Sequence, residues 1–190
     1  MLGVAPVDDS SLGRPALFDI AGGALDRLVR VQQDFPQPGV LFRDLTPVLA
    51  DRQALADVAR ALAAVAPDAT LIAGLESRGF LLGAATAMIA GTGVLAIRKP
   101  GKLPGVVLGE DYALEYGTGR LELHPDDVPT GSLVLVIDDV LATGGTAAAA
   151  CRLLRRAGAE IAGVAVAVEI SGLPGRGALP GIPVTALRCW

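Results

Sequence analysis

Four short apolar runs, rich in β-branched residues, constrain the fold of this chain most strongly. They are Thr70–Gly74, Val94–Arg98, Leu133–Asp139 and Ile161–Ile170. Segments with helical spacing follow at least the first and the third run, and strands that alternate with helices are typical of a parallel sheet covered on both faces. The sequence therefore predicts an α/β fold in which helices flank a central, mostly parallel sheet.

Size and composition indicate a single domain. A chain of 190 residues, 52% of them hydrophobic, can bury one well-formed core and is short for two. We expect residues 1–16, rich in Gly, Pro, Ser and Asp, to form a disordered leader and residues 17–190 to form the domain. Residues 99–131 are too polar and turn-rich for the core, and we expect a mobile ribbon there with short strands near Val106 and Leu121.

Charge and cysteine usage argue against several classes of protein. The net charge of -4 and the pI near 4.9 lack the basic face of a nucleic-acid binder, so we expect no nucleic-acid partner. The two cysteines, Cys151 and Cys189, have neither metal-ligand nor redox spacing, which fits a reducing cytoplasm better than a secreted disulfide framework. The N-terminus also lacks the basic start and apolar core of a signal peptide.

One uncharged segment, Gly79–Ile97, is long enough to span a bilayer. Its interior Ala-Gly-Thr-Gly-Val resembles a turn, however, and a turn would interrupt a membrane helix. A buried helix over Phe80–Ala90 followed by a buried strand over Val94–Arg98 explains the segment better, so we expect no membrane association.

The first third of the chain carries two helical patterns around an irregular stretch. Ala24–Gln33 has helical spacing, residues 34–49 hold too many prolines for regular structure, and Asp51–Ala66 has the pattern of an amphipathic helix capped by Asp51. Three arginines of a later helix are expected on its solvated face: Arg152, Arg155 and Arg156.

The third apolar run leads into the most informative stretch of the chain. Leu133–Ile137 is predicted to be a buried strand, with Asp138 and Asp139 at its carboxyl end. The turn Ala142–Thr146 follows and leads into a helix closed by Gly158. Ligands of open parallel sheets bind at that carboxyl edge, so we expect a binding site here.

The residues of the turn suit a phosphate. Glycines let backbone N–H groups approach an anion, Thr143 and Thr146 add hydroxyl donors, and the helix start contributes the positive end of its dipole. Two carboxylates beside the turn would repel the phosphate itself. They suit the vicinal hydroxyls of a ribose, bound directly, through water or through a metal shell.

Two other phosphate motifs do not fit this stretch. A Walker loop ends in Gly-Lys-Ser/Thr, and no Lys is present; a dinucleotide fingerprint places its acid about 20 residues after the glycines, whereas here the acids come first. The remaining structural alternative is that Asp138 and Asp139 merely end a strand and Gly144-Gly145 merely turns the chain.

The stretch VLVIDDVLATGGT resembles the phosphoribosyl pyrophosphate (PRPP) signature of type I phosphoribosyltransferases. DFPQPGVLFRDLTPVL, AGLESRGFLLG, IRKPGKLPG and LEYG occur in the order and character seen in the adenine-specific members of that family, and the similarity runs from about Asp34 to Glu169. The resemblance implies the type I phosphoribosyltransferase fold, with a small hood at about residues 17–50 and a flexible catalytic flap at about residues 99–131. It also implies transfer of the phosphoribosyl group of PRPP to adenine, giving AMP and pyrophosphate.

The resemblance assigns PRPP-binding roles to three groups of residues. Asp138 and Asp139 orient the ribose, and Mg²⁺ is expected to bind through PRPP with no firm direct protein ligand. Members of this fold commonly hold a cis peptide bond in the loop that binds the pyrophosphate, here between Glu76 and Ser77. For Lys99 and Lys102, a merely solvated basic turn remains an alternative. The 5′-phosphate falls to Ala142, Thr143, Gly144, Gly145 and Thr146, and the pyrophosphate to Glu76, Ser77, Arg78, Arg98, Lys99 and Lys102.

Adenine and catalysis involve two other segments. In the family, main-chain groups of the hood bond the purine edge, which gives Leu41 and Arg43 that role and places Phe42 nearby, unless Phe42 is only a hydrophobic anchor. Glu115 would contact the purine near N7 and manage its proton, and Tyr116 would close the site; a surface carboxylate and a packing aromatic are the alternatives. Together with Arg78 these are the expected catalytic residues, and relatives are usually homodimers.

Two other functions remain open at this point. Regulators that sense PRPP share the fold but carry a basic DNA-binding domain, and the first 33 residues here are too few and too acidic for one. Transferases of 6-oxopurines usually have an acid where this chain has Ala142, which favours adenine. The acidic stretch before Glu115 and a Leu-Leu where a second aromatic is frequent depart from the usual adenine pattern and leave the flap dynamics open.

Overall fold

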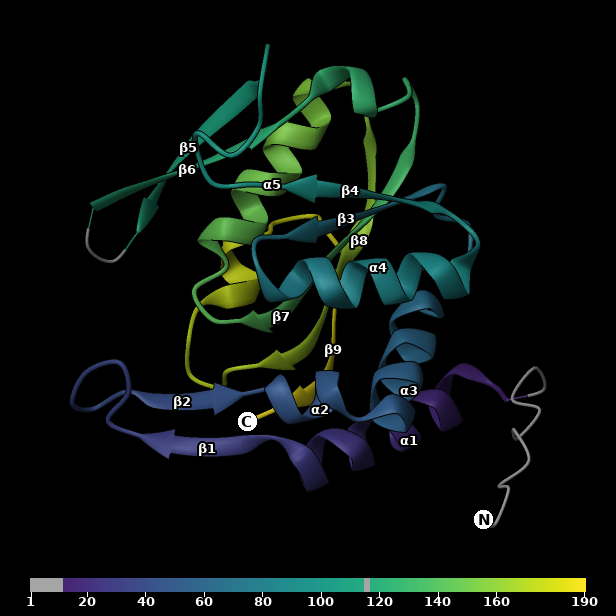
Figure 1. Cartoon of the computed structure of the whole chain (residues 1–190), viewed down its shortest axis with the longest axis vertical. Coiled ribbons are helices and arrows are strands. Elements are labelled where there is room, and N and C mark those ends of the chain that lie inside the picture. Colours follow the sequence, from purple (N-terminus) through teal and green to yellow (C-terminus); the bar gives the residue numbers. More distant parts are fainter. Residues whose placement is uncertain (1–11, 115–116) are drawn as a thin grey trace.

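The computed structural model describes residues 12–114 and 117–190. It consists of a central sheet with helices on both faces, a hairpin of β1 and β2 beside it and a ribbon of β5 and β6 (Figure 1). The helices are α1 (Arg14–Leu28), α2 (Thr46–Ala50), α3 (Arg52–Ala63), α4 (Arg78–Ala90) and α5 (Gly145–Arg156). The strands are β1 (Arg30–Gln33), β2 (Leu41–Asp44), β3 (Leu71–Leu75), β4 (Gly93–Ile97), β5 (Leu108–Leu114), β6 (Gly117–Leu123), β7 (Leu133–Leu141), β8 (Glu160–Glu169) and β9 (Val184–Cys189).

The central sheet has the strand order β4-β3-β7-β8-β9, and every neighbouring pair is parallel. The predicted α/β fold is therefore confirmed. The sequence did not predict the fifth strand, β9, because this edge strand is only half-buried and mixes Thr and Arg with apolar residues. Pairing with the open edge of β8, rather than a local pattern, makes it a strand.

Alternation along β7 explains its continuous apolar run. Val134 and Val136 pack on one face of the sheet, where α5 lies, whereas Leu135 and Ile137 pack on the other face against α1, α3 and α4. A strand buried on both faces needs apolar residues at every position, which is why the run shows no polar alternation.

The N-terminal segments differ from their predicted structure. Helix α1 ends at Leu28, and Arg30–Gln33 forms β1, which pairs antiparallel with β2; the helical prediction for residues 30–33 was wrong. The stretch 34–49 was expected to be irregular, but it contains β2 and α2. All of β1 is exposed, so it has no apolar alternation that could have identified it. Residues 14–16, expected in the leader, begin α1.

Two predicted features of the first half are confirmed. Asp51 caps α3, because its Oδ1 accepts the Ala54 N–H at 2.8 Å. The uncharged segment 79–97 contains most of α4 and all of β4, separated by a left-handed Gly91 with φ 69°. Within residues 12–114 and 117–190, no helix is long and apolar enough to cross a membrane.

The ribbon is part of the core at one end. Its strands β5 and β6 pair antiparallel, and a backbone bridge between Arg98 and Glu122 joins β6 to the end of β4. Leu121, Leu123 and Val128 are buried in the main core, so the expectation that residues 99–131 lie outside it was wrong for the second half of the segment. Because β6 crosses the sheet edge here, its inward side chains become buried although the segment is polar overall.

Candidate active site

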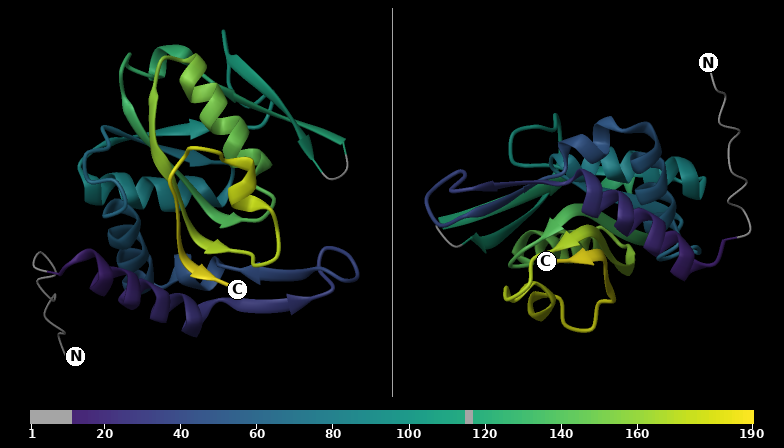
Figure 2. Two further views of the ribbon diagram at one scale, coloured as in Figure 1. Left: turned by 180° about the vertical axis from the view of Figure 1, so that it is seen from behind. Right: turned by 90° about the horizontal axis from the view of Figure 1, so that it is seen from below.

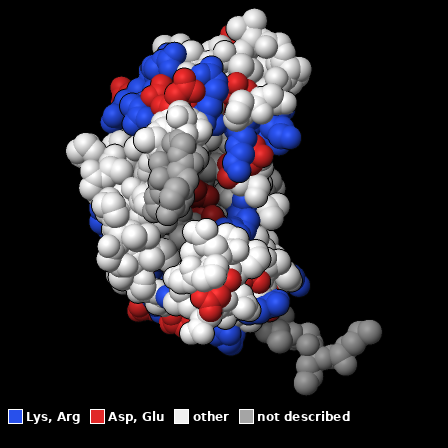
Figure 3. All heavy atoms as spheres, turned by 90° about the vertical axis from the view of Figure 1, so that its left-hand side faces the viewer, with Lys and Arg blue, Asp and Glu red and all other residues white. Residues whose placement is uncertain are grey.

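The predicted site segments meet at one edge of the sheet. Strands β3, β4 and β7 are parallel and in register, with Leu75 opposite Ile97 and Gly74 opposite Ile137, so the chain leaves all three at the same edge. The hairpin and the ribbon both extend from this side (Figure 2). Seen from there, acidic side chains are recessed in a hollow with basic side chains beside them (Figure 3).

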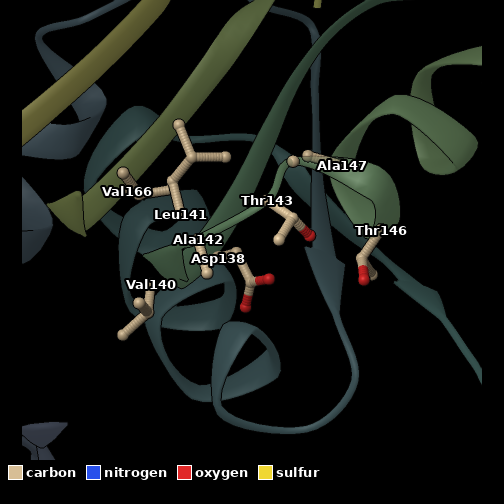
Figure 4. A pocket seen from close by; sticks show the side chains of 9 residues that line it. Asp138, Val140, Leu141, Ala142, Thr143, Thr146, Ala147 and Val166 are labelled. Carbon is tan, nitrogen blue, oxygen red and sulfur yellow. The ribbon is translucent and has the colours of Figure 1, made fainter. Parts of the chain in front are cut away.

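The phosphate loop (Ala142–Thr146) connects β7 to α5. Gly144 begins the helix in a left-handed conformation with φ 80°, and the first turn of α5 carries no acidic residue that would oppose an anion. Together with the end of β7 the loop encloses a cavity of about 90 Å³ (Figure 4). The cavity is lined by Asp138, Val140, Leu141, Ala142, Thr143, Gly144, Thr146, Ala147 and Val166.

The two adjacent carboxylates have different surroundings. Strand β7 continues to Leu141, so both acids lie within the strand rather than beyond its end. Asp138 is half-buried and borders the phosphate-loop cavity. Asp139 is buried, accepts a hydrogen bond from Arg78 Nε, and donates its own N–H to Asp138 Oδ1 at 2.9 Å. Of the two predicted ribose ligands, only Asp138 therefore lines this cavity.

The environment of Asp138 disfavours its charge. Burial raises the pKa of its carboxyl above the ordinary value and the negative charge of Asp139 raises it further, while the hydrogen bond from the Asp139 N–H opposes both effects. The close approach of α4 contributes to this burial, since a Cβ on Gly79 would lie only 3.0 Å from Asp138 Oδ1.

Arg78 links the hairpin to the acids. Its Nε binds Asp139, and its guanidinium carbon lies 5.5 Å from the ring centroid of Phe42 on β2. Phe42 in turn packs edge-on against Phe35, with 5.0 Å between the ring centroids. Phe42, Arg78 and Asp139, predicted to serve three different parts of the substrates, therefore form one contact series.

The other two hood residues lie differently. Leu41 is exposed, and the guanidinium carbon of Arg43 lies 5.0 Å from the ring centroid of Trp190. Strand β2 belongs to a sheet of two strands, so one of its backbone edges faces no other strand of residues 12–114 and 117–190. Such an edge can offer N–H and C=O groups to a planar ligand, which suits the predicted main-chain contacts to a purine.

The side chain of Glu76 holds two predicted pyrophosphate segments together. Its Oε2 accepts the Lys99 N–H at 2.8 Å and Arg98 Nε at 3.3 Å. Burial favours a higher pKa, but these hydrogen bonds and the nearby positive charges hold the pKa of Glu76 below its ordinary value. The expected cis peptide bond between Glu76 and Ser77 is present. Lys99 is exposed, as is the other predicted lysine, Lys102.

The expected catalytic residues Glu115 and Tyr116 lie outside the described residues. The ribbon strands on either side of them dock on α5, where Glu110 accepts Arg152 Nε at 2.6 Å and Arg156 Nη1 at 2.8 Å. Arg152 and Arg156 lie on the solvated face of α5, as predicted, and their ion pairs with Glu110 are an addition that the sequence did not predict. The four-residue spacing of Arg152 and Arg156 and the acidic stretch before Glu115 were the only sequence signals of this contact. Nothing in the sequence indicates that the ribbon and α5 pair with each other.

Two further contacts of the phosphate loop were not predicted. The Thr146 hydroxyl donates to the Tyr112 hydroxyl of the ribbon at 3.5 Å. A turn at Pro174–Ala178 packs on Gly144, since a Cβ there would lie 2.2 Å from the carbonyl oxygen of Gly175. No sequence pattern predicts either contact, because both join segments that are distant along the chain.

Comparison with known proteins agrees with this arrangement. The family model described as phosphoribosyl transferase domain matches residues 47–176. An adenine phosphoribosyltransferase from Clavibacter michiganensis subsp. michiganensis is 58% identical over 154 residues, which cover 81% of this chain and 88% of that protein.

Solved structures give the same result. The crystal structure of adenine phosphoribosyltransferase from Rhodothermus marinus has a TM-score of 0.83 and 43% identity, covering 90% of this chain and 98% of that one. The Saccharomyces cerevisiae adenine phosphoribosyltransferase, complexed with D-2,5-dideoxy-2,5-imino-altritol 1,6-bisphosphate and adenine, has a TM-score of 0.83 and 35% identity, covering 88% and 98% of the two chains. In sequence and in fold, this chain belongs to the adenine phosphoribosyltransferase family.

Proposed function

We propose that this protein transfers the 5-phosphoribosyl group of PRPP to a ring nitrogen of adenine, giving AMP and pyrophosphate. The observation that carries the proposal is the position of Asp138 beside the phosphate loop, at the edge where Arg78 and Phe42 also lie. The reaction passes through a transition state with oxocarbenium character at the ribose. It needs a fixed sugar phosphate, a neutralised leaving group, a positioned base and exclusion of water.

The sugar phosphate is fixed from two directions. Backbone N–H groups of the phosphate loop and the hydroxyls of Thr143 and Thr146 bind the 5′-phosphate at the start of α5. Asp138 accepts hydrogen bonds from the ribose hydroxyls. The Asp139 N–H, which donates to Asp138 Oδ1, holds that carboxylate in place. When ionised, the carboxylates of Asp138 and Asp139 favour the positive charge that develops at the anomeric carbon.

The pyrophosphate faces the turn of Glu76, Ser77 and Arg78. The side chain of Glu76 accepts the Lys99 N–H, and the guanidinium of Arg78 binds Asp139, so both side chains have fixed partners. Lys99 and Lys102, which follow Arg98 in the sequence, are exposed. These groups offset the charge of the leaving group.

Mg²⁺ fits this site as an ion carried by PRPP. Among residues 12–114 and 117–190, no three His, Cys, Asp or Glu side chains form a group that could hold a metal ion, and Asp139 is already paired with Arg78. Asp138, at the cavity, would hold the ion's water shell. When bound, Mg²⁺ neutralises charge on the departing pyrophosphate.

Adenine is placed by the hood, about residues 17–50, and the flap, about residues 99–131. The open edge of β2 supplies main-chain contacts at Leu41 and Arg43, and Phe42 packs nearby. Glu115 handles the proton near N7, and Tyr116 closes the site.

An assay of each purine with PRPP and Mg²⁺ tests the reaction. We expect AMP from adenine and no nucleotide from hypoxanthine, guanine or xanthine. The main competing activity is 6-oxopurine transfer, which the absence of an acid at Ala142 disfavours. Consumption of hypoxanthine or xanthine with adenine left unconverted would contradict the proposal.

We further propose that the protein acts as a homodimer in the cytoplasm. Helix α4 presents Leu81, Met88 and Ile89 to solvent, with Met88 82% exposed, and Val94 of the neighbouring edge strand is exposed as well. This apolar face suits a second copy. The cytoplasm suits a chain whose two cysteines, Cys151 and Cys189, have neither metal-ligand nor redox spacing.

Sedimentation analysis tests the assembly. We expect Met88→Glu to dissociate the dimer and Ile20→Glu, a change at an exposed position of α1, to leave it intact. A wild-type protein that sediments as a monomer would contradict the proposed dimer.

A further inference from the structure

A turn outside the predicted site packs directly on the phosphate loop. This supporting turn (Pro174–Ala178) contains a short 3-10 helix. A Cβ on Gly144 would lie 2.2 Å from the carbonyl oxygen of Gly175, and a Cβ on Gly175 would lie 2.6 Å from the carbonyl oxygen of Ala142. Backbone therefore meets backbone at both glycines, with the side chains of Ala178 and Leu141 beside the contact, so the position of the supporting turn determines the position of the loop.

A bidentate ion pair holds the supporting turn. Arg176 donates its Nε to Glu169 Oε1 at 2.9 Å and its Nη2 to Glu169 Oε2 at 2.7 Å. Its Nη1 donates to the carbonyl oxygen of Val184 on β9 at 2.7 Å. Two parallel bonds to one carboxylate fix the direction of the Arg176 guanidinium as well as its distance. Arg176, which directly follows Gly175, therefore has little conformational freedom.

The acid of this pair is built into the sheet beside the loop. Glu169 ends β8, is only 9% exposed, and pairs in register with Leu141, the last residue of β7 before the loop. The Ile170 N–H also donates to the carbonyl oxygen of Leu141 at 2.9 Å. Glu169 thus lies beside the end of β7 through its position in the sheet and holds the supporting turn through its carboxylate.

We propose that Glu169 and Arg176 are positioning residues that hold the phosphate loop in the conformation that binds the 5′-phosphate of PRPP. The inference rests on the proposed function of the loop. A loop that is ordered before binding does not lose conformational entropy on binding, so removing the ion pair weakens phosphate binding without touching the ligand.

Steady-state kinetics of two variants test this role. Glu169→Gln keeps the size of the side chain but removes its charge, and Arg176→Lys keeps the charge but loses the two-pronged geometry. We expect each to raise the KM for PRPP and the Kd for AMP about 5- to 20-fold, which is less than the full loss of a charged hydrogen bond because Arg176 is about half-exposed and the pair acts on the ligand only through the loop. The KM for adenine at saturating PRPP should change less than about twofold.

The double variant shows whether the two residues act together. Since both single changes break the same pair, Glu169→Gln combined with Arg176→Lys should raise the KM for PRPP no further than the more severe single variant. Effects that multiply instead would overturn the proposed joint role.

A second ion pair serves as the matched control. Arg188 binds Asp26 with Nε at 3.0 Å from each carboxylate oxygen, and this pair joins β9 to α1 rather than to the phosphate loop. Asp26→Asn, which changes a more exposed carboxylate, should lower the melting temperature no more than Glu169→Gln does and leave the KM for PRPP unchanged. If Glu169→Gln and Arg176→Lys leave the KM for PRPP unchanged, as expected for Asp26→Asn, or worsen every kinetic constant equally, the positioning role is wrong. A wild-type protein that neither binds PRPP nor makes AMP would overturn the proposed function, and the positioning role with it.

Discussion

The guanidinium of Arg78 and the carboxylate of Asp139 form an ion pair that joins the start of α4 to the end of β7. Asp139 is buried and Arg78 is about one-third exposed. The pair therefore consists of an acid inside the protein and a cation that faces the site. The adjacent Asp138 has no such cation bound to it and borders the phosphate-loop cavity. Two neighbouring acids of one motif therefore have different surroundings.

Removing this pair should weaken PRPP handling. Asp139→Asn and Asp139→Ala leave Arg78 without its charged partner, and charged hydrogen bonds contribute about 1.5–3 kcal/mol, so we expect kcat/KM for PRPP to fall about 10- to 100-fold. Initial rates at varied PRPP measure this. Asp57→Asn on α3, which removes a partly buried ion pair with Arg60 away from the site, is the control and should keep normal kinetics. Unchanged PRPP kinetics in both Asp139 variants would rule out the role.

Loss of Glu115 should affect a different kinetic constant. If this residue manages the purine proton, Glu115→Ala and Glu115→Gln lower kcat about 10²- to 10³-fold and leave the KM for PRPP nearly unchanged. Comparison with Asp139→Ala under the same conditions measures the contrast. Equal losses in every kinetic constant for Glu115→Ala and Asp139→Ala would contradict the separate roles.

Glu110 should control how firmly the ribbon rests on α5. Its two arginine partners are each about half-exposed, so Glu110→Gln should cost only about 1 kcal/mol, which corresponds to about fivefold faster hydrogen exchange of residues 108–114. The hydrogen bond from Arg152, together with the bond from Arg156, lowers the pKa of Glu110, so the contact persists above the ordinary carboxyl pKa and is lost only as the pH falls through the lowered value. Hydrogen exchange near pH 7 that is equal in both proteins would contradict this docking contact.

Asp138 should make stability depend on pH in an unusual direction. Because the folded protein raises the pKa of Asp138, the folded state holds its proton more tightly than the unfolded state, so the free energy of unfolding falls as the pH rises from about 3.8 through the raised pKa. Asp138→Asn removes the charge and keeps an acceptor for the Asp139 N–H. We expect this variant to melt at a higher temperature than the wild type near pH 8, with a smaller difference near pH 4, although its activity falls.

Asp44 offers a control of opposite sign for that measurement. Hydrogen bonds from Thr46 lower the pKa of Asp44, so its stabilisation is present above the ordinary pKa and is lost as the pH falls through the lowered value. Asp44→Asn should therefore melt below the wild type near pH 8 and approach it under acidic conditions. A difference between Asp138→Asn and wild type that does not vary with pH would contradict the inferred shift.

The sequence by itself determined the parallel strands β3, β4, β7 and β8 and the phosphate loop. Strands buried on both faces need uninterrupted apolar runs, and a turn that binds phosphate through its backbone needs glycines next to a helix start. Both requirements are local, so they can be recognised within about a dozen residues. The edge strand β9 and the strands of the hairpin carry no such pattern, and pairing with a neighbour makes them strands.

Only the tertiary structure decided which partner each charged side chain has. Arg78 reaches Asp139 across 61 residues, and Arg152 and Arg156 reach Glu110 across 42 and 46 residues. The fold also brought the supporting turn onto the phosphate loop. Helix and strand periodicity reports which face of an element is buried, but the partner on that face depends on how distant elements pack. For this reason the candidate site residues could be proposed from the sequence, whereas the different surroundings of Asp138 and Asp139 follow only from the folded arrangement.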